Sequence, residues 1–211
     1  MIQSLEYKDK TAFIVLNANP LTLGHLYLIK TAASENEHVY LIPVAEDNSF
    51  FTYAERTKII KANINEFENV TLLPGTEYLI SKNFFPSYFL QSNLQAIKEQ
   101  SNLDANLFCD LLEGKKNITR YVGDEPFSET TKLYNETLHK VLEEHGLALK
   151  QISRLAEAKK ATSASLVRKL IYENYFESLK NLVSTKTYKI ICDQKYHQRA
   201  IAHPELIFKN N

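Results

Sequence analysis

The stretch LNANPLTLGH, residues 16 to 25, places a threonine, a glycine and a histidine just after a proline-containing turn. If a helix begins near Leu23, Thr22 and His25 lie on the same side of its first turn, and Gly24 lets a ligand approach the backbone. The amides at a helix start and the positive end of the helix dipole favour a phosphate group. A histidine beside them can donate hydrogen bonds to phosphoryl oxygens. These residue types and spacings indicate a phosphate-binding turn.

The same turn has a simpler explanation. In this alternative, Asn19 and Pro20 form an ordinary turn, Gly24 relieves crowding, and His25 is a half-exposed side chain without a ligand. A Gly-His pair alone is a weak signal for function. The choice between the two interpretations therefore depends on the rest of the chain.

A second candidate helix start occurs in ATSASLVRKL, residues 161 to 170. Ser163 can cap this helix, Ser165 lies in its first turn, and Arg168 follows three residues later on the same face. Hydroxyl groups and a guanidinium are suited to binding a pyrophosphate. Capping alone would also explain the serines, and a solvated surface charge would explain Arg168. If both helix starts lie at the same edge of the fold, they favour a shared polyphosphate ligand.

The elements that must position these residues alternate along the chain. Short apolar runs typical of buried strands are followed by patterns typical of helices. Such alternation predicts a parallel sheet of about five strands with helices on both faces. The expected strands span 11–17, 38–45, 69–74, 118–123 and 147–152, and the expected helices span 23–34, 52–66, 87–113 with a break, and 128–145.

In parallel sheets of this kind, ligands bind beyond the carboxyl ends of the strands. The stretch NANPLTLGH follows the first expected strand, and AEDNSF, GTEYLIS and GDEPFSE follow the next three, so four polar loops line one edge. Within these loops, Glu46 and Asp47 either approach a Mg²⁺ ion or cap the following helix. Residues of the first loop that could contact a ligand at this rim are Asn17, Asn19 and Gly24.

The composition excludes several classes of protein. The chain has 211 residues, of which 44% are hydrophobic and 24% charged, as in globular proteins, and its formal net charge is zero. No overall electrostatic field would attract nucleic acid, and no apolar run is long enough to span a membrane.

Cys109 and Cys192 are too few for a disulfide framework, which with the lack of a signal peptide predicts a cytoplasmic setting. His197 and His203 lack the spacing of a zinc pair, and no side chain is assigned as a metal ligand.

No composition shift or linker marks a second domain. We therefore expect one unit over residues 1–183, with residues 184–211 forming a helical carboxyl-terminal extension packed on the same domain. The acidic residues of the helix expected near 87–113, Asp104, Asp110 and Glu113, are most simply a solvated face.

Several motifs together resemble one known family. LNANPLTLGH resembles the H/T-x-G-H signature of the nucleotidylyltransferase superfamily, and TSASLVR resembles its I-S-x-S-x-x-R element. More closely, the chain is similar to the citrate lyase ligases, whose motifs occur here in the same order. These motifs are NANPLTLGH, the residues Glu46, Asp47, Ser49, Phe51, Thr52, Tyr53 and Arg56, YLIS with FFPSYFL (78–90), RYVGDEPFS (120–128), YN (134–135) and TSASLVR (162–168).

The resemblance implies a Rossmann-like α/β fold and an ATP-dependent, Mg²⁺-assisted transfer of AMP to acetate or a similar small acid. Pyrophosphate is released, and acetyl then passes to the prosthetic-group thiol of citrate lyase, so an acyl carrier or a citrate lyase subunit is an implied partner. Thr22 and His25 would bind the triphosphate and stabilise charge at the α-phosphorus. Ser163, Ser165 and Arg168 would hold the β and γ phosphates. Gly123 and Asp124 would lie where such folds approach the nucleotide.

One departure of the chain from the family pattern lies in a loop. Where the family has V-K-E-D-x-S-R-F, this chain reads VAEDNSFF, so that Ala45 and Phe50 replace two basic residues. Two alternatives therefore remain beside adenylylation of a carboxylate. One is adenylyl transfer to a phosphate ester, as in pantetheine-phosphate adenylyltransferases. The other is a nucleotide-binding module with weakened catalysis.

Overall fold

The computed structural model describes residues 2–45, 48–75, 94–124, 129–153 and 163–208. Glu46 and Asp47, the YLIS and FFPSYFL motifs, and residues 125–128 of the fourth rim loop lie outside the described residues. The alternative roles of Glu46 and Asp47 therefore remain predictions.

The described strands form one parallel sheet in the order β3-β2-β1-β4-β5. Register is fixed at its centre, where Thr11 of β1 aligns with His38 of β2 and with Ile118 of β4. The expected five-stranded parallel sheet is confirmed. Its strands are β1 (Thr11–Leu16), β2 (His38–Pro43), β3 (Val70–Leu72), β4 (Ile118–Gly123) and β5 (Ala148–Ile152).

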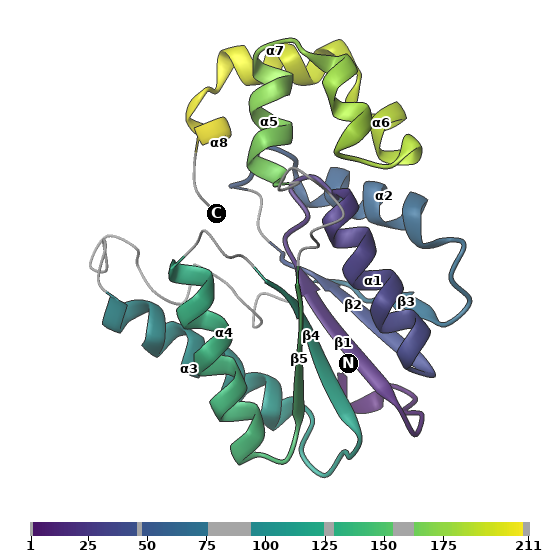
Figure 1. The fold of residues 1–211 in the computed structure, drawn as a ribbon, viewed down its shortest axis with the longest axis vertical. Coiled ribbons are helices and arrows are strands. Elements are labelled where there is room, and N and C mark those ends of the chain that lie inside the picture. The colour runs from purple at the N-terminus through teal and green to yellow at the C-terminus, as the bar shows by residue number, and fades with distance from the viewer. Residues whose placement is uncertain (1, 46–47, 76–93, 125–128, 154–162, 209–211) are drawn as a thin grey trace.

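Four helices cover the two faces of this sheet, as the alternating pattern predicts (Figure 1). Alternate residues of β1 point to opposite faces, because side chains along a strand have a period of two. Ala12 and Ile14 belong to the apolar core on the α1 and α2 side, whereas Phe13 belongs to the core on the α3 and α4 side. The helices are α1 (Leu23–Glu35), α2 (Tyr53–Ile64), α3 (Leu94–Leu111) and α4 (Glu129–Glu144).

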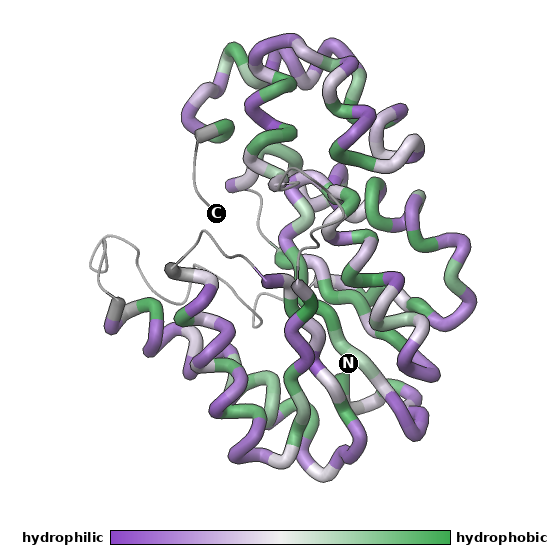
Figure 2. The backbone as a smooth tube through the Cα atoms, in the orientation of Figure 1, coloured by the Kyte–Doolittle hydropathy of each residue, from purple (hydrophilic) through white to green (hydrophobic). Residues whose placement is uncertain are grey.

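The carboxyl-terminal part is helical and packs beyond one end of the sheet, at the top of Figure 1. It comprises α5 (Ala164–Tyr172), a 3-10 helix (Phe176–Asn181), α6 (Thr185–Ile191), α7 (Gln194–Ala202) and α8 (Glu205–Phe208). Apolar and polar residues alternate along these helices (Figure 2). Residues of α5, α6, α7 and α8 join the core shared with α1 and α2.

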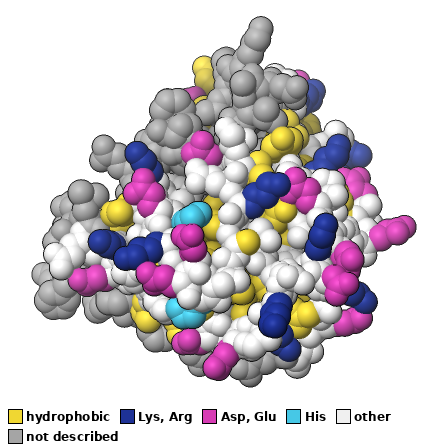
Figure 3. Space-filling view, turned by 60° about the horizontal axis from the view of Figure 1, so that its bottom comes forward, with side chains coloured by type: hydrophobic (Ala, Val, Ile, Leu, Met, Phe, Trp, Pro, Cys, Tyr) yellow, Lys and Arg dark blue, Asp and Glu magenta, His cyan; other side chains and the backbone are white. Residues whose placement is uncertain are grey.

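Charged side chains of both signs are interspersed on the face in Figure 3, in keeping with the balance of 25 basic and 25 acidic residues. Over the described parts of the chain, no helix is long and apolar enough to cross a membrane.

Candidate functional site

The two candidate phosphate-binding turns lie at the carboxyl-end rim of the sheet. Strand β1 ends at Leu16 and helix α1 begins at Leu23, with the six residues 17–22 between them. Helix α5 begins at Ala164 and stands above the same rim (Figure 1). Both helix starts predicted from the sequence are therefore present, each within one residue of the expected place.

At the start of α1, Thr22 is the N-cap residue and His25 is the third residue of the helix. The Thr22 amide donates to His25 Nδ1 at 3.1 Å, and Thr22 Oγ1 lies 2.9 Å from the same nitrogen. An amide can donate only to an unprotonated ring nitrogen, so this contact favours the neutral tautomer with its proton on Nε2. Thr22 is buried and His25 half-buried. The cap thus fixes the ring and makes Nε2 a donor.

The loop between β1 and α1 is held by two buried arginines. Arg56 Nη1 donates to the carbonyl of Asn17 at 2.9 Å, and Arg168 Nη1 donates to the carbonyl of Asn19 at 2.8 Å. Between these two residues, Ala18 has a φ of 48°, a left-handed conformation that costs a non-glycine residue roughly 1–2 kcal/mol. Charge-assisted hydrogen bonds on both sides offset such strain. The loop is therefore held in one conformation by side chains from α2 and α5.

Two side-chain atoms in this loop lack partners within the described structure. Asn19 is 2% exposed; its Oδ1 accepts from the Phe51 amide at 2.9 Å, but its Nδ2 has no acceptor. Asn17 Oδ1 is also buried without a donor. Because a buried polar atom without a partner costs about 1–3 kcal/mol, these atoms are suited to a ligand or ordered water.

The start of α5 has the expected cap. Ser163 Oγ accepts from the Leu166 amide at 3.1 Å, and the exposed Ser165 accepts from Arg168 Nη2 at 3.3 Å. Arg168 itself is 1% exposed, so its explanation as a solvated surface charge is wrong. Burial lowers the pKa of Arg168 to about 10, which leaves it cationic at neutral pH. A positive charge is thus held between the two helix starts.

Two amides at the start of α1 are not open to a phosphate. The Leu23 amide donates to the carbonyl of Leu182 at 2.9 Å. The amide of His25, the third residue of α1, belongs to the capping box with the Thr22 side chain. The expectation of open amides is therefore corrected at Leu23 and at His25, and Gly24 is the remaining residue of this first turn.

The residues that follow β4 lie at the same rim. The Asp124 amide donates to the carbonyl of Ile152 in β5 at 2.8 Å, and Gln151 donates to the Asp124 carboxylate at 3.3 Å. Asn135 of α4 donates to the carbonyl of Gly123 at 3.2 Å. These contacts place Gly123 and Asp124 where β4 and β5 end together.

Phe50, one of the two departures from the family loop, is part of the core. It is 1% exposed and packs edge-on against Phe51, with ring centroids 4.9 Å apart. The guanidinium carbon of Arg199, from α7, lies 5.9 Å from the Phe50 ring centroid, and its Nη1 donates to the Phe50 carbonyl at 3.0 Å. The chain therefore places an arginine from another element beside the position where the family loop has a basic residue.

The carboxyl-terminal segment contacts the starts of α1, α2 and α5. The sequence predicts a packed extension here, but not these particular contacts. The carbonyl of Leu182 accepts a hydrogen bond from the Leu23 amide, and the carbonyl of Ile207 accepts one from Arg168 Nε at 3.4 Å. Arg199 makes a two-pronged ion pair with Glu55, at 2.6 and 2.9 Å, and Glu55 caps the Thr52 amide at the start of α2. The helices after residue 182 thus support the rim that carries the candidate site.

We expect Arg199→Ala to lower the free energy of unfolding by about 1.5–3 kcal/mol, because it removes charged hydrogen bonds to Glu55 and to the Phe50 carbonyl. Burial alone raises the pKa of Glu55, but Arg199 and Thr52 outweigh it and lower the pKa, which keeps the pair ionised. Urea unfolding measures the change. Lys195→Ala, on the same helix but 56% exposed, is the control, and equal effects of the two substitutions would contradict the account.

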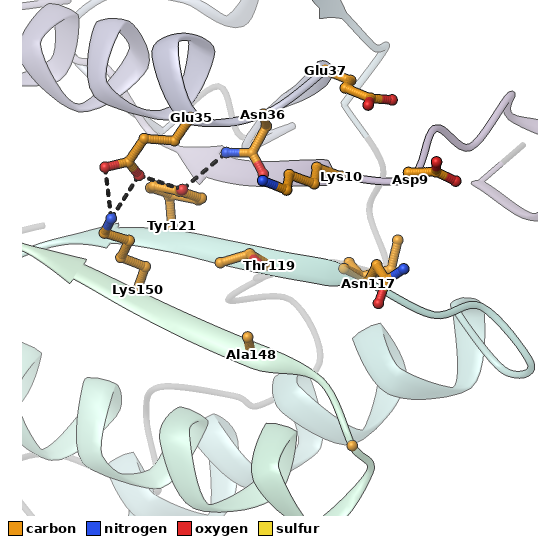
Figure 4. A pocket seen from close by; sticks show the side chains of 12 residues that line it. Asp9, Lys10, Glu35, Asn36, Glu37, Asn117, Thr119, Tyr121, Ala148 and Lys150 are labelled. Atoms are coloured by element: carbon orange, nitrogen blue, oxygen red, sulfur yellow. Dashed lines mark hydrogen bonds and ion pairs between the residues drawn. The ribbon is translucent and has the colours of Figure 1, made fainter.

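A separate hollow of about 1000 Å³ lies at the opposite, amino-end edge of the sheet (Figure 4). On its wall, Lys150 pairs with Glu35 at 2.6 Å, and Tyr121 donates to Glu35 at 2.6 Å and accepts from Asn36 at 2.9 Å. These polar groups satisfy one another. Because ligands of parallel α/β sheets bind at the carboxyl ends, this hollow is not the candidate site.

A buried cluster on the second face of the sheet was also missed. Arg120 of β4 donates through Nη2 to Asp104 of α3 at 3.0 Å and to Tyr134 of α4 at 2.8 Å. Asp104 is 5% exposed, so its assignment to a solvated face is wrong, whereas Asp110 and Glu113 are exposed as expected. An aspartate and an arginine sixteen residues apart carry no local signal of contact.

Within the described ranges, no three histidine, cysteine, aspartate or glutamate residues are placed to hold a metal ion. Both cysteines, Cys109 and Cys192, are free thiols.

Two solved structures with a similar fold are adenylyltransferases by title. One is a putative nicotinate-nucleotide adenylyltransferase from Vibrio parahaemolyticus, with a TM-score of 0.56 and 16% identity over 87% of this chain and 99% of that chain. Another is a bifunctional NMN adenylyltransferase/ADP ribose pyrophosphatase from Francisella tularensis, with a TM-score of 0.57 and 12% identity over 94% of this chain and 54% of that chain. At such identities the likeness shows the Rossmann-like fold alone.

Relatives found by sequence have higher identity to the chain than these structures do. The chain is 36% identical to a citrate lyase ligase of Klebsiella pneumoniae over 198 residues, 90% of this chain and 58% of that protein. It is 32% identical to the Escherichia coli ligase over 197 residues, 90% of this chain and 56% of that protein. The chain thus spans little more than half the length of these relatives. The citrate lyase ligase C-terminal domain matches residues 11–191, and the chain belongs to that family.

Proposed function

We propose that the chain transfers AMP from ATP to a small carboxylic acid and releases pyrophosphate. The observation that carries this proposal is the 2.8 Å hydrogen bond from Arg168 to the Asn19 carbonyl. It joins α5 to the loop that leads into α1, and the sequence assigns the starts of these two helices to one polyphosphate. Family membership supports the reaction, since the matched relatives are named as citrate lyase ligases.

In this proposal His25 donates from Nε2 to phosphate oxygens and stabilises the charge that develops as the α-phosphorus is attacked. Thr22 holds the ring through Nδ1. Arg168 contributes positive charge and holds the Asn19 carbonyl in place. Ser163 caps α5, and Ser163 and Ser165 at its start hold the β and γ phosphates. Nucleotidyl transfer of this kind depends on positioning and on charge stabilisation rather than on a covalent enzyme intermediate.

The loop between β1 and α1 has hydrogen-bonding groups that a nucleotide could satisfy. Asn17 Oδ1 and Asn19 Nδ2 are buried with no partner in the described structure, and Gly24, Gly123 and Asp124 lie on the same rim. Mg²⁺ would neutralise phosphate charge when bound. Because the described residues hold no cluster of metal ligands, phosphate oxygens and water would supply most of its coordination.

The wider assignments belong to the same proposal. Residues 1–183 form the nucleotidylyltransferase-like domain and residues 184–211 its packed extension, in a cytoplasmic setting. An acyl carrier or a citrate lyase subunit would receive the activated acyl group, as the names of the matched relatives suggest.

Pyrophosphate release tests the proposal. With ATP and Mg²⁺, we expect release that depends on an added small carboxylate such as acetate and that stops when EDTA removes the metal. Release that requires a phosphate ester instead would favour the pantetheine-phosphate alternative. ATP binding without turnover on either acceptor class would favour a module with weakened catalysis. Either result would contradict the proposed reaction.

A further inference from the structure

The buried cluster of Arg120, Asp104 and Tyr134 has hydrogen-bonding capacity that the described protein does not use. Arg120 is 1% exposed, and one of its nitrogens, Nη2, makes both contacts to the other two residues. Its Nε and Nη1 are buried without acceptors, and Asp104 Oδ1 is buried without a donor. Native interiors rarely leave such groups unpaired, so a non-protein partner is expected.

The contacts present orient the guanidinium. Tyr134 donates to Asp104 Oδ2 at 2.6 Å, the same oxygen that accepts from Arg120, so all three groups meet at one point. The guanidinium carbon of Arg120 also lies 4.7 Å from the ring centroid of Phe108, within the distance of a cation–π contact. Asp104 and Tyr134 thus hold one corner of the guanidinium, while Nε and Nη1 face other directions.

The charges of the cluster are those that an anion-binding guanidinium needs. Burial alone lowers the pKa of Arg120, but Tyr134 and Asp104 outweigh it and raise the pKa, so the side chain stays cationic. Burial raises the pKa of Tyr134 well above its usual value, and the hydroxyl remains a neutral donor.

The cluster is also close to the rim. Arg120 precedes Gly123 by three residues in β4, about 10 Å along an extended strand. Tyr134 is followed directly by Asn135, which donates to the Gly123 carbonyl at 3.2 Å. The two adjacent residues of α4 therefore connect the cluster to the proposed nucleotide site.

We propose that Arg120, oriented by Asp104 and Tyr134, binds the carboxylate of the acceptor acid through Nε or Nη1. This inference rests on the proposed function, because it assigns the acceptor end of the same site. Carboxylate oxygens are the acceptors that a guanidinium binds best. A small aliphatic group would then contact the surrounding apolar core, in which Phe108 is fully buried.

Acetate binding to the whole chain tests this proposal without requiring turnover. ¹³C-labelled acetate is titrated by NMR, with and without a non-hydrolysable ATP analogue and Mg²⁺, and acetamide is the uncharged competitor. We expect saturable acetate binding that acetamide does not displace. Arg120→Lys should weaken it about 10- to 150-fold, the range for losing a hydrogen bond to a charged group, with ATP affinity within about twofold of wild type.

Tyr134→Phe provides a second variant if Arg120→Lys does not fold. It should weaken acetate binding severalfold, whereas Tyr175→Phe, the same change at a position 61% exposed, should not. No saturable acetate binding by wild type, equal competition by acetamide, or wild-type affinity in a folded Arg120→Lys or Tyr134→Phe variant would overturn the proposal. A failure of ATP binding or of pyrophosphate release in wild type would instead count against the proposed function.

Discussion

His25→Ala is expected to lower the rate of pyrophosphate release about 10²- to 10³-fold, the usual effect of removing one preorganised donor from a developing charge. The structure fixes the ring through Nδ1, which accepts from the Thr22 amide at 3.1 Å, so that Nε2 carries the proton. The substitution removes this donor. It also removes the acceptor of the Thr22 amide, at a cost of about 1 kcal/mol in stability. Steady-state kinetics and thermal unfolding measure the two effects.

His139→Ala is the matched control, because His139 is 61% exposed on α4, across the sheet from the site. It should retain wild-type turnover. A His25→Ala variant that kept wild-type pyrophosphate release with the same acceptor would show that His25 does not stabilise the reaction.

Arg168→Ala is expected to weaken ATP binding by about 1.5–3 kcal/mol, or roughly 10- to 150-fold. The substitution removes a positive charge and also the donor to the Asn19 carbonyl, so the loop that carries two of the nucleotide candidates loses its connection to α5. Isothermal titration calorimetry with ATP and Mg²⁺ measures the change. Arg168→Lys should recover only part of the affinity, since an ammonium cannot reach Asn19, Ser165 and Ile207 together.

The neighbouring Lys169→Ala tests whether any charge on α5 has this effect. Lys169 is 55% exposed and pairs only loosely with Glu173, at 3.8 Å. Its removal should change ATP affinity by no more than about twofold, the scale of a surface ion pair. Equal losses for Arg168→Ala and Lys169→Ala would mean that the buried contacts of Arg168 are irrelevant.

Local signals were sufficient to predict the sheet and the two helix starts. Runs such as residues 11–16 are apolar throughout because both faces of a parallel strand are buried, and this pattern needs no knowledge of distant residues. Thr22 and Ser163 could be placed as helix starts because capping depends on residues three apart.

The burial of charged residues could not be predicted in the same way. Arg168 contacts the carbonyl of Asn19, 149 residues away, and Arg199 contacts Glu55, 144 residues away. Asp104 has a helical neighbourhood that equally fits a solvated face, whereas its contacts with Arg120 of β4 and Tyr134 of α4 lie in the interior. In each case the partner comes from another element, so the contact depends on the tertiary packing.

An experimental structure with a non-hydrolysable ATP analogue and Mg²⁺ tests the shared anion site most directly. The account predicts the triphosphate between the starts of α1 and α5, with oxygens about 3 Å from His25 Nε2 and from Ser165 Oγ. A triphosphate bound elsewhere, or one that touches only one of the two helix starts, would contradict it.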